Sequence, residues 1–480
     1  MRFPLLLPSC LIFLFYLAAL PAAHVSMFAD PDSYWHLATG DLIRVLGALP
    51  EYDGWSLSAG QKHWYITSWG WDAAASFVYA RLGWHGLVMM NSITIAATLA
   101  VLFAGCMQRS REGFSAFFAT LLAAACLLDV SLRPHQAGLL CIALLMLLLN
   151  AVAERRLAPR WLLAVPPFML VWVNLYAGFI IGLFLFGLFA LDALLRRERL
   201  QYYILAGALS LAACCLNPAG IGLFRDLLAV GGDTSRQLIG EWRSLSFSAA
   251  DIPALTYLAL FAARVIARPR AFGRREYAMA LIWFALGIMS IRHLRIFAIV
   301  SAPLLAAAMT SHGKPAAWMS GIHACGTRLL ESPKAARLAL AASIAASMLM
   351  LSPLSENLYR TRNFNPLPDM SAELDWLEKN RPQARLLNSY NLGGPLIFLT
   401  HGRIPVFMDG RVGTAYPLSV IRDYIRFHNA EPGWTDIFDR YRLDGAIVLS
   451  SDREFIWRFK GMDGWRTAFA GPAATIFLRR

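Results

Sequence analysis

Two carboxylates stand two residues apart near the N-terminus, in the run ADPDSYWHL at residues 29–37. On an extended segment that leads into a helix, Asp30 and Asp32 can share a divalent cation such as Mg²⁺ or Mn²⁺, or divide the roles of general base and metal ligand. The alternative is that Asp32 caps the helix and interacts with its dipole. The spacing alone leaves both interpretations open.

A second set of polar residues lies near the C-terminus. Tyr390 and Asn391 precede two glycines and a proline, and Asp409 and Arg411 flank another glycine. Glycines before a strand-like run, followed by an Asp-Gly-Arg turn, would let the backbone approach a ligand closely. Ordinary turn chemistry explains the same residues, so the pattern is weak by itself.

The composition requires a membrane around most of the chain. Of its 480 residues, 57% are hydrophobic and 16% are charged, and the mean hydropathy is +0.48. These values are too apolar for a soluble enzyme of this length. The net charge of +13 lies mostly in short loops, so nucleic acid is not expected as a partner.

Apolar stretches long enough to cross a hydrocarbon core recur until residue 354. We expect about eleven transmembrane helices, at residues 4–22, 86–106, 113–129, 134–152, 161–177, 178–195, 201–217, 252–267, 276–291, 293–311 and 337–354. Arginine-rich loops then alternate on one side, which the positive-inside rule makes cytoplasmic. The N-terminus is expected in the cytoplasm and the C-terminal part outside, in the periplasm of a bacterial inner membrane.

The first apolar segment also resembles a signal peptide, because small residues follow it at positions 18–23. We prefer a retained helix, since Arg2 is the single charge in front of it. The topology downstream is the same in both cases.

We divide the chain into a transmembrane domain (1–354), a linker (355–370) and a soluble α/β domain (371–480). Two outside loops of the first domain, at 24–85 and 217–251, are long, and such loops usually carry function.

Local patterns predict elements in these parts. Helical spacing indicates amphipathic helices at 33–46 and 67–82 that lie along the membrane interface. A capped helix is expected at 371–377. Strand-like runs follow at residues 385–387, 395–399, 405–408 and 445–449.

Further charged residues fall on the outside by this topology. Glu241 lies in the second long loop, where solvent exposure is the alternative interpretation. Arg133 lies in a tight outside loop. Arg292, His293 and Arg295 lie at the outer boundary of the tenth span. Arginine there can extend to lipid headgroups, but basic residues on this side indicate a bound anion, most simply a lipid phosphate.

Together these features resemble the GT-C superfamily of membrane glycosyltransferases, and specifically the catalytic subunit of oligosaccharyltransferases. Residues 30–36 are similar to the first acidic motif of that family, and Glu241 is placed like the glutamate that ends its Ser-Val-Ser-Glu motif. Arg295 resembles the arginine that meets the lipid-linked pyrophosphate. Residues 389–397, followed by Asp409, look like the stretch around the WWDYG signature.

The resemblance implies transfer of a sugar or oligosaccharide from a polyprenyl phosphate or pyrophosphate donor, at the extracytoplasmic face, with Mg²⁺ or Mn²⁺ as the candidate cofactor. It implies inverting chemistry with a carboxylate as general base. The catalytic candidates are Asp30, Asp32 and Glu241, with Asp30 and Asp32 as the metal ligands. The substrate-binding candidates are Arg295, Arg292, His293, His36, Arg133, Tyr390, Asn391, Asp409 and Arg411.

Two departures from the family pattern bear on the acceptor. Ser389-Tyr390-Asn391 replaces Trp-Trp-Asp of the signature, and residues 133–136 stand where a second acidic pair is expected. Of a glycan, a lipid or a protein as acceptor, we therefore favour a lipid-linked or polymeric glycan over an Asn-x-Ser/Thr peptide.

Two other classes of function remain open. A transporter or flippase of lipid-linked glycans would show broken, polar segments paired between two halves, and the sequence has no such repeat. A non-enzymatic envelope assembly protein would keep the soluble domain but would not need carboxylates at the outer membrane face.

Overall fold

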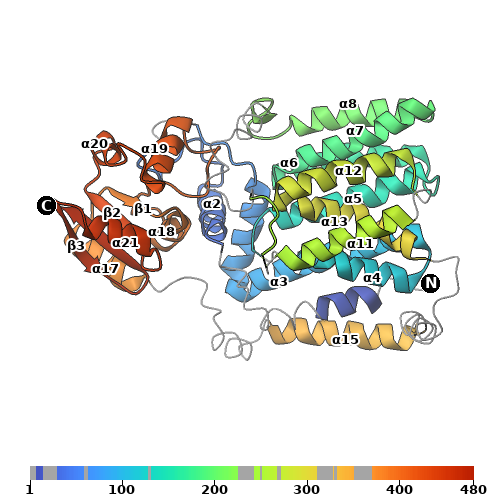
Figure 1. The fold of residues 1–480 in the computed structure, drawn as a ribbon, viewed down its shortest axis with the longest axis horizontal. Coiled ribbons are helices and arrows are strands. Elements are labelled where there is room, and N and C mark those ends of the chain that lie inside the picture. Colours follow the sequence, from blue (N-terminus) through green and yellow to red (C-terminus); the bar gives the residue numbers. More distant parts are fainter. Residues whose placement is uncertain are drawn as a thin grey trace.

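The structure, a computed structural model, describes residues 7–14, 30–58, 63–127, 131–224, 243–248, 251–267, 272–310, 328, 332–350 and 370–480. Two lobes lie side by side along the longest axis of the molecule, a bundle of long helices and a smaller lobe that contains a sheet (Figure 1). The smaller lobe is formed mainly by the C-terminal residues.

The bundle contains helices that fit a membrane. Four helices of the described residues are long and apolar enough to cross one: α3 (Trp69–Ser110), α5 (His135–Ala153), α7 (Phe179–Arg196) and α13 (Ile291–Met309). The others are α4 (Gly113–Ala124), η1 (Pro159–Ala164), α6 (Val165–Leu175), α8 (Leu200–Cys214), α11 (Ile252–Ala267), α12 (Arg274–Met289) and α15 (Pro333–Met350). The expected total of about eleven spans stays a prediction.

The central helix of the bundle is α13. It contacts α3, α4, α5, α11 and α12, and from Leu294 to Leu305 every side chain is buried. A helix that is apolar on all sides is stable only when other elements or lipid surround it. Its first turns therefore hold Arg292, His293 and Arg295 at a fixed place at one end of the bundle.

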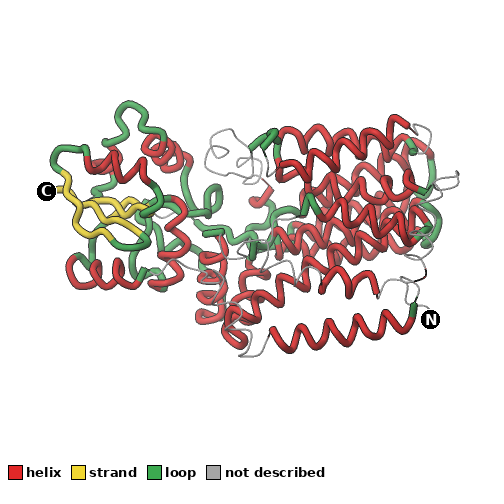
Figure 2. Tube along the Cα trace, turned by 60° about the horizontal axis from the view of Figure 1, so that its bottom comes forward, coloured by secondary structure: helices red, strands yellow, loops and turns green. Residues whose placement is uncertain are grey.

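The C-terminal lobe is built on a four-stranded sheet in the order β1-β2-β4-β3, drawn in yellow in Figure 2. The strands are β1 (Leu386–Asn388), β2 (Gly445–Leu449), β3 (Trp465–Ala470) and β4 (Ala474–Arg479). β1 pairs with β2 in parallel, and the other two pairings are antiparallel. The helices are α17 (Ser371–Asn380), η5 (Tyr390–Leu392), α18 (Gly393–Thr400), α19 (Leu418–His428), α20 (Asp436–Arg440) and α21 (Arg453–Lys460).

Some of the elements predicted in this lobe are confirmed and others are wrong. The helix at 371–377 and the strands at 385–387 and 445–449 correspond to α17, β1 and β2. The strand expected at 395–399 is wrong, because these residues belong to α18. The run at 405–408 forms no strand; Val406 makes a single bridge to Ser56. Strands β3 and β4 were not predicted.

Helix α2 (Asp32–Leu46) joins the two lobes. It contacts α3 on one side and α18 on the other, and it lies between them in Figure 1. The prediction of a helix at 33–46 is confirmed, and the predicted helix at 67–82 is the first part of α3, which bends at Gly83 with φ 57° and ψ −153°. The position of both segments at a membrane interface stays a prediction.

The described part of the loop at residues 24–85, which we predict to lie outside, packs into the core of the C-terminal lobe. Trp55, Trp64 and Ile66 belong to the same buried cluster as Val406 and Phe407. Backbone hydrogen bonds run both ways between this loop and Val406. The loop therefore carries the C-terminal lobe, while the domain boundaries at residues 354 and 370 stay predictions.

Candidate active site

Asp30, Asp32 and Arg133, which we call the acidic site, come together at the start of α2. Arg133 Nη1 donates to Asp30 Oδ2 at 2.9 Å, and Nη2 lies 3.0 Å from Asp32 Oδ2. Arg133 stands two residues before α5, so the packing of α5 on α3 brings it to the N-terminal motif. The two carboxylates therefore face one guanidinium, in a geometry that the local sequence does not specify.

One backbone and one side-chain hydrogen bond at the start of α2 fix the two carboxylates. Asp30 Oδ1 accepts a hydrogen bond from the backbone N–H of Asp32 at 2.9 Å. Asp32 Oδ1 accepts one from Trp35 Nε1 at 3.0 Å. Each carboxylate keeps its second oxygen directed at Arg133.

Asp32 has the electrostatics of a general base. Burial raises the pKa of Asp32 above its ordinary value, and the charge of Asp30 raises it further, while Arg133 and His36 act against this increase. A carboxylate with a raised pKa holds a transferred proton better than an exposed one. Of the two acidic residues, Asp32 is therefore the stronger candidate for proton transfer.

The C-terminal lobe closes directly on the acidic motif through two glycines. A methyl group on Gly410 would lie 1.7 Å from Asp32 Oδ1, and one on Gly394 would lie 2.1 Å from the carbonyl oxygen of Pro31. Only glycine permits such an approach. The sequence left close approach of this backbone open beside ordinary turn chemistry, and in the structure the backbone approaches the acidic motif.

Tyr390 lies beside the acidic site. Burial raises the pKa of its hydroxyl well above the ordinary value, and Asp32 is the next largest cause. The hydroxyl therefore stays protonated and can act as a hydrogen-bond donor. Asn391 follows it and is exposed.

Asp409 and Arg411 belong to a second set, which we call the buried cluster, with Asp53 and Tyr416. Arg411 Nη1 lies 2.8 Å from Asp53 Oδ1 and Nη2 lies 2.7 Å from Asp409 Oδ2, and none of these side chains is exposed. Tyr416 donates to Asp409 Oδ2 at 2.8 Å. This geometry indicates a structural role for Asp409 and Arg411. The predicted role was contact with the substrate.

Two of the basic residues near the start of α13 contact aromatic side chains, one in the α6–α7 connection and one on α12. Arg292 Nη2 donates to the hydroxyl of Tyr176, and the ring of His293 lies 6.0 Å from that of Trp283. Arg295 is buried. Their predicted contact with a donor phosphate stays a prediction, and Glu241 lies outside the described residues.

His36 has a buried partner that the sequence did not reveal. Its Nδ1 lies 2.7 Å from Asp72 Oδ1, and Ser68 Oγ lies 3.2 Å from Asp72 Oδ2. Asp72 is in the first turn of α3, where an acidic residue is ordinarily explained by the helix dipole. Its separation of 36 residues from His36 hid the contact.

The acidic site offers two carboxylates to a divalent cation. Within the described ranges, no group of three or more His, Cys, Asp or Glu side chains is placed to hold a metal ion. Mg²⁺ is commonly held by one or two carboxylates, with water and substrate phosphates as its other ligands. Asp30 Oδ2 and Asp32 Oδ2 fit that pattern, provided that Arg133 moves away from both.

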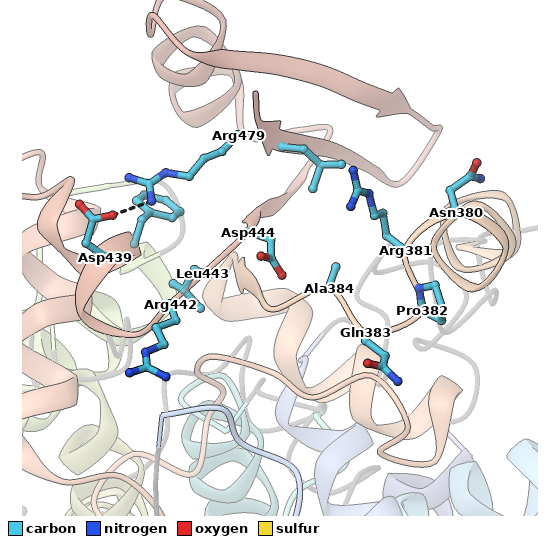
Figure 3. Close-up of a pocket in the computed structure, with 12 residues that line it drawn as sticks. Asn380, Arg381, Pro382, Gln383, Ala384, Asp439, Arg442, Leu443, Asp444 and Arg479 are labelled. Atoms are coloured by element: carbon cyan, nitrogen blue, oxygen red, sulfur yellow. Dashed lines mark hydrogen bonds and ion pairs between the residues drawn. The ribbon is translucent and has the colours of Figure 1, made fainter.

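A large hollow in the sheet lobe is a different feature (Figure 3). It has a volume of about 740 Å³ and is lined by the end of α17, the α20–β2 connection and β4. Asp439 and Arg479 pair across one side of it at 2.6 Å. None of its lining residues belongs to the acidic site.

No protein-family model and no curated protein matches the sequence. Solved structures do match the fold. The oligosaccharyltransferase AglB from Archaeoglobus fulgidus, in complex with an inhibitory peptide and a dolichol-phosphate, is 12% identical with a TM-score of 0.52, over 94% of this chain and 69% of that one. An oligosaccharyltransferase from the same organism, in complex with Zn and sulfate, is 11% identical with a TM-score of 0.57, over 96% of this chain and 70% of that one.

A shorter protein matches over its whole length. ArnT from Cupriavidus metallidurans, bound to undecaprenyl phosphate, is 13% identical with a TM-score of 0.51, and 97% of each chain is covered. At these identities the similarity shows the fold. The predicted resemblance is confirmed at that level: this chain has the fold of the GT-C membrane glycosyltransferases.

Proposed function

We propose that this protein is a membrane glycosyltransferase that moves a sugar or oligosaccharide from a polyprenyl phosphate or pyrophosphate donor to an acceptor. The observation that carries the proposal is the acidic site, in which Asp30 and Asp32 face Arg133 beneath the C-terminal lobe. Two of the solved structures with this fold contain dolichol-phosphate or undecaprenyl phosphate, which supports a lipid-linked donor.

The residues of the acidic site can perform an inverting transfer. Asp32 accepts the proton of the acceptor hydroxyl while the oxygen forms a bond to the anomeric carbon. The bond from that carbon to the phosphate oxygen breaks, and the polyprenyl phosphate or pyrophosphate leaves with the electron pair. Arg133 supplies positive charge beside the leaving phosphate, and Tyr390 donates a hydrogen bond.

A divalent cation held by Asp30 and Asp32 would neutralise charge on the leaving phosphate. When no cation is bound, Arg133 would supply this positive charge, because the guanidinium of Arg133 occupies the same place, in contact with the same two carboxylate oxygens. Asp30 then serves mainly to hold this cation or Arg133 in place through Oδ2, because Oδ1 already accepts a hydrogen bond from the backbone N–H of Asp32.

The charge distribution supports a location in a bacterial inner membrane, with the N-terminus cytoplasmic and the C-terminal lobe periplasmic. The acidic site would then face the periplasm, where nucleotide sugars are not supplied. This side is the one on which a lipid-linked donor is needed. A lipid-linked or polymeric glycan is the acceptor that we favour.

Two substitutions test the proposal. The purified protein in nanodiscs is incubated with a panel of polyprenyl phosphate and pyrophosphate sugars and with glycan acceptors, and product formation is measured. We expect Asp32→Asn to lower the transfer rate by about 10²- to 10⁴-fold, the usual contribution of general base catalysis. Asp30→Asn should also abolish transfer, since it disturbs the same site.

Asp41→Asn is the matched control, because Asp41 lies on α2 as well but is exposed and pairs only with the exposed Arg44. It should keep full activity. Expression and thermal midpoint should be unchanged in all three variants. Full activity in both Asp30→Asn and Asp32→Asn would overturn the assignment of the acidic site.

A further inference from the structure

A buried polar group lies directly beneath the acidic site. The side chains of His36, Asp72 and Ser68 are on two different helices or their caps, and their residues are 5%, 0% and 3% exposed. His36 Nδ1 lies 2.7 Å from Asp72 Oδ1. Burying a carboxylate is costly unless hydrogen bonds satisfy it, so this arrangement has a purpose beyond filling space.

The contacts of Asp72 select one form of the imidazole. Asp72 accepts a hydrogen bond from Ser68 on Oδ2 and meets His36 Nδ1 with Oδ1. An ionised carboxylate in this position accepts a hydrogen bond from Nδ1–H. In the neutral ring, Nε2 then carries no proton and keeps its lone pair. In the described part of the chain no group hydrogen-bonds to Nε2.

The imidazole is also tied to the catalytic carboxylate. The rings of Trp35 and His36 stack with centroids 3.6 Å apart, and Trp35 Nε1 donates to Asp32. His36 also stands four residues after Asp32 on α2, so the two side chains lie on the same face of the helix, about one turn apart. The ring therefore has Asp72 at Nδ1 and packs against Trp35, the residue that donates to Asp32.

We propose that Asp72 is a positioning residue that fixes His36 with Nε2 free to accept a hydrogen bond from the acceptor hydroxyl beside Asp32. This inference rests on the proposed function. His36 would orient the hydroxyl, and Asp32 would take its proton. Without Asp72 the ring loses the contact that fixes its tautomer and rotation, and the hydroxyl would be oriented less well.

A pair of amide substitutions separates this role from a structural one. Asparagine places an amide near the position of Nδ1, so His36→Asn keeps a partner for Asp72 but removes Nε2. Glutamine places its amide near the position of Nε2, so His36→Gln keeps a polar group toward the acceptor but loses the short contact with Asp72. We expect His36→Asn to raise the KM for acceptor about tenfold, the usual scale of one hydrogen bond, and His36→Gln to raise it less. A structural role predicts the opposite order, and that result would overturn the proposal.

The second measurement does not depend on transfer. Nitrogen NMR of ¹⁵N-histidine-labelled protein, with the His36 signals assigned by their loss in His36→Gln, reports which ring nitrogen carries the proton. We expect protonated Nδ1 and unprotonated Nε2 in the parent protein and in Ser68→Ala, and loss of this preference in Asp72→Asn. Asp72→Asn should also raise the KM for acceptor about tenfold, with little change in the KM for donor.

The outcomes distinguish this inference from the proposed function. If the parent protein transfers sugar but its His36 carries the proton on Nε2, the positioning role of Asp72 is wrong and the proposed function stands. If the parent protein turns over no donor of the panel, the proposed function fails. The NMR spectrum then still decides whether Asp72 sets the tautomer.

Discussion

The acidic site and the buried cluster are both built from two aspartates around one arginine, and both join the first outside loop or its helix to another part of the chain. In the acidic site the side chains of Asp30, Asp32 and Arg133 remain 14–21% exposed. In the buried cluster, Arg411 and its two aspartates are completely enclosed. The same residue types therefore stand in two different environments.

This difference in exposure distinguishes a structural role from a catalytic one. The guanidinium of Arg411 donates to Asp53, Asp409 and Ser56 and lies 4.7 Å from the ring of Trp64, which leaves no side for a ligand. Arg133 lies where solvent and substrate can enter. A charged cluster of given composition is thus a candidate active site only when some of its polar atoms can reach a ligand.

The largest effect should come from breaking the buried cluster. Arg411→Gln leaves the carboxylates of Asp53 and Asp409 enclosed without a cation, and removing one partner of a buried ion pair typically costs about 3–5 kcal/mol. We expect a large loss of thermal stability and detachment of the first loop, measured by thermal unfolding and limited proteolysis in nanodiscs. Transfer should fall only in proportion to the folded fraction.

A compensated variant sharpens this test. Combining Arg411→Met with Asp53→Asn and Asp409→Asn removes all three charges, and replacing a whole buried ion cluster often costs little. It should recover much of the stability and activity. If it folds well but transfers no sugar, Arg411 or its aspartates take part in the reaction and the predicted substrate contact is restored.

Gly410 links the two clusters, because it stands between Asp409 and Arg411 and touches Asp32. Gly410→Ala would force a methyl group into Asp32 Oδ1 and to within 2.9 Å of Trp35 Nε1. Displacing a catalytic group by about 1 Å can cost about a hundredfold in rate, and we expect a loss of that order with a smaller effect on stability. Gly187→Ala is the control, since nothing lies within 4 Å of its added methyl group. Unchanged transfer rates in Gly410→Ala would show that the position of Asp32 does not matter.

Four of the predicted spans correspond to described helices that are long and apolar enough to cross a membrane, and the sheet lobe is predicted less well. Long apolar runs and loop charges depend on composition alone, so α3, α5, α7 and α13 follow from them. A short apolar run such as 395–399 is consistent with a strand or a buried helix. In the structure this run forms helix α18, which packs on α2. β3 was not predicted because its inward and outward residues do not alternate, and its partner β4 is buried on both faces.

The acidic site could be predicted only in part. Asp30 and Asp32 are visible as a local pair, but Arg133 lies 103 residues from Asp30. Local spacing cannot show that they meet, and we assigned Arg133 a role only because of the side of the membrane on which it was expected. Asp72 and Trp35 were missed for the same reason, because their functions depend on contacts made by folding.

Arg295 extends the comparison to a third environment, near the outer end of α13. It is buried like Arg411, but the partner that we predict for it, from the resemblance to oligosaccharyltransferases, is a donor phosphate. Lysine keeps the charge and loses the paired geometry, so Arg295→Lys should weaken donor affinity by about 1–3 kcal/mol. Donor titration measures this. Arg292→Lys should have less effect, because Arg292 contacts Tyr176. If Arg295→Lys and Arg295→Ala both bind donor as tightly as the parent protein does, Arg295 has a structural role.

The smallest effect concerns the pH profile of the acidic site. Burial raises the pKa of Asp32 above its ordinary value, so the folded protein binds that proton more tightly than the unfolded chain does. Any stability from this group is therefore present at low pH and lost as the pH rises through the folded pKa. The transfer rate has the opposite pH dependence, because Asp32 must be ionised to act as the base. The transfer rate should fall as the pH decreases through a value above about 3.9, the ordinary pKa of aspartate.

Arg133 lowers the pKa of Asp32, so Arg133→Gln should move this acid limb to higher pH, whatever it does to the maximum rate. Arg479→Gln removes an exposed arginine that pairs with Asp439 in the sheet lobe and should leave the limb in place. The measurement is the transfer rate at saturating substrate over the range in which each variant stays folded. An acid limb at the same pH in Arg133→Gln and in the parent protein would mean that Asp32 is not the group whose ionisation limits the reaction.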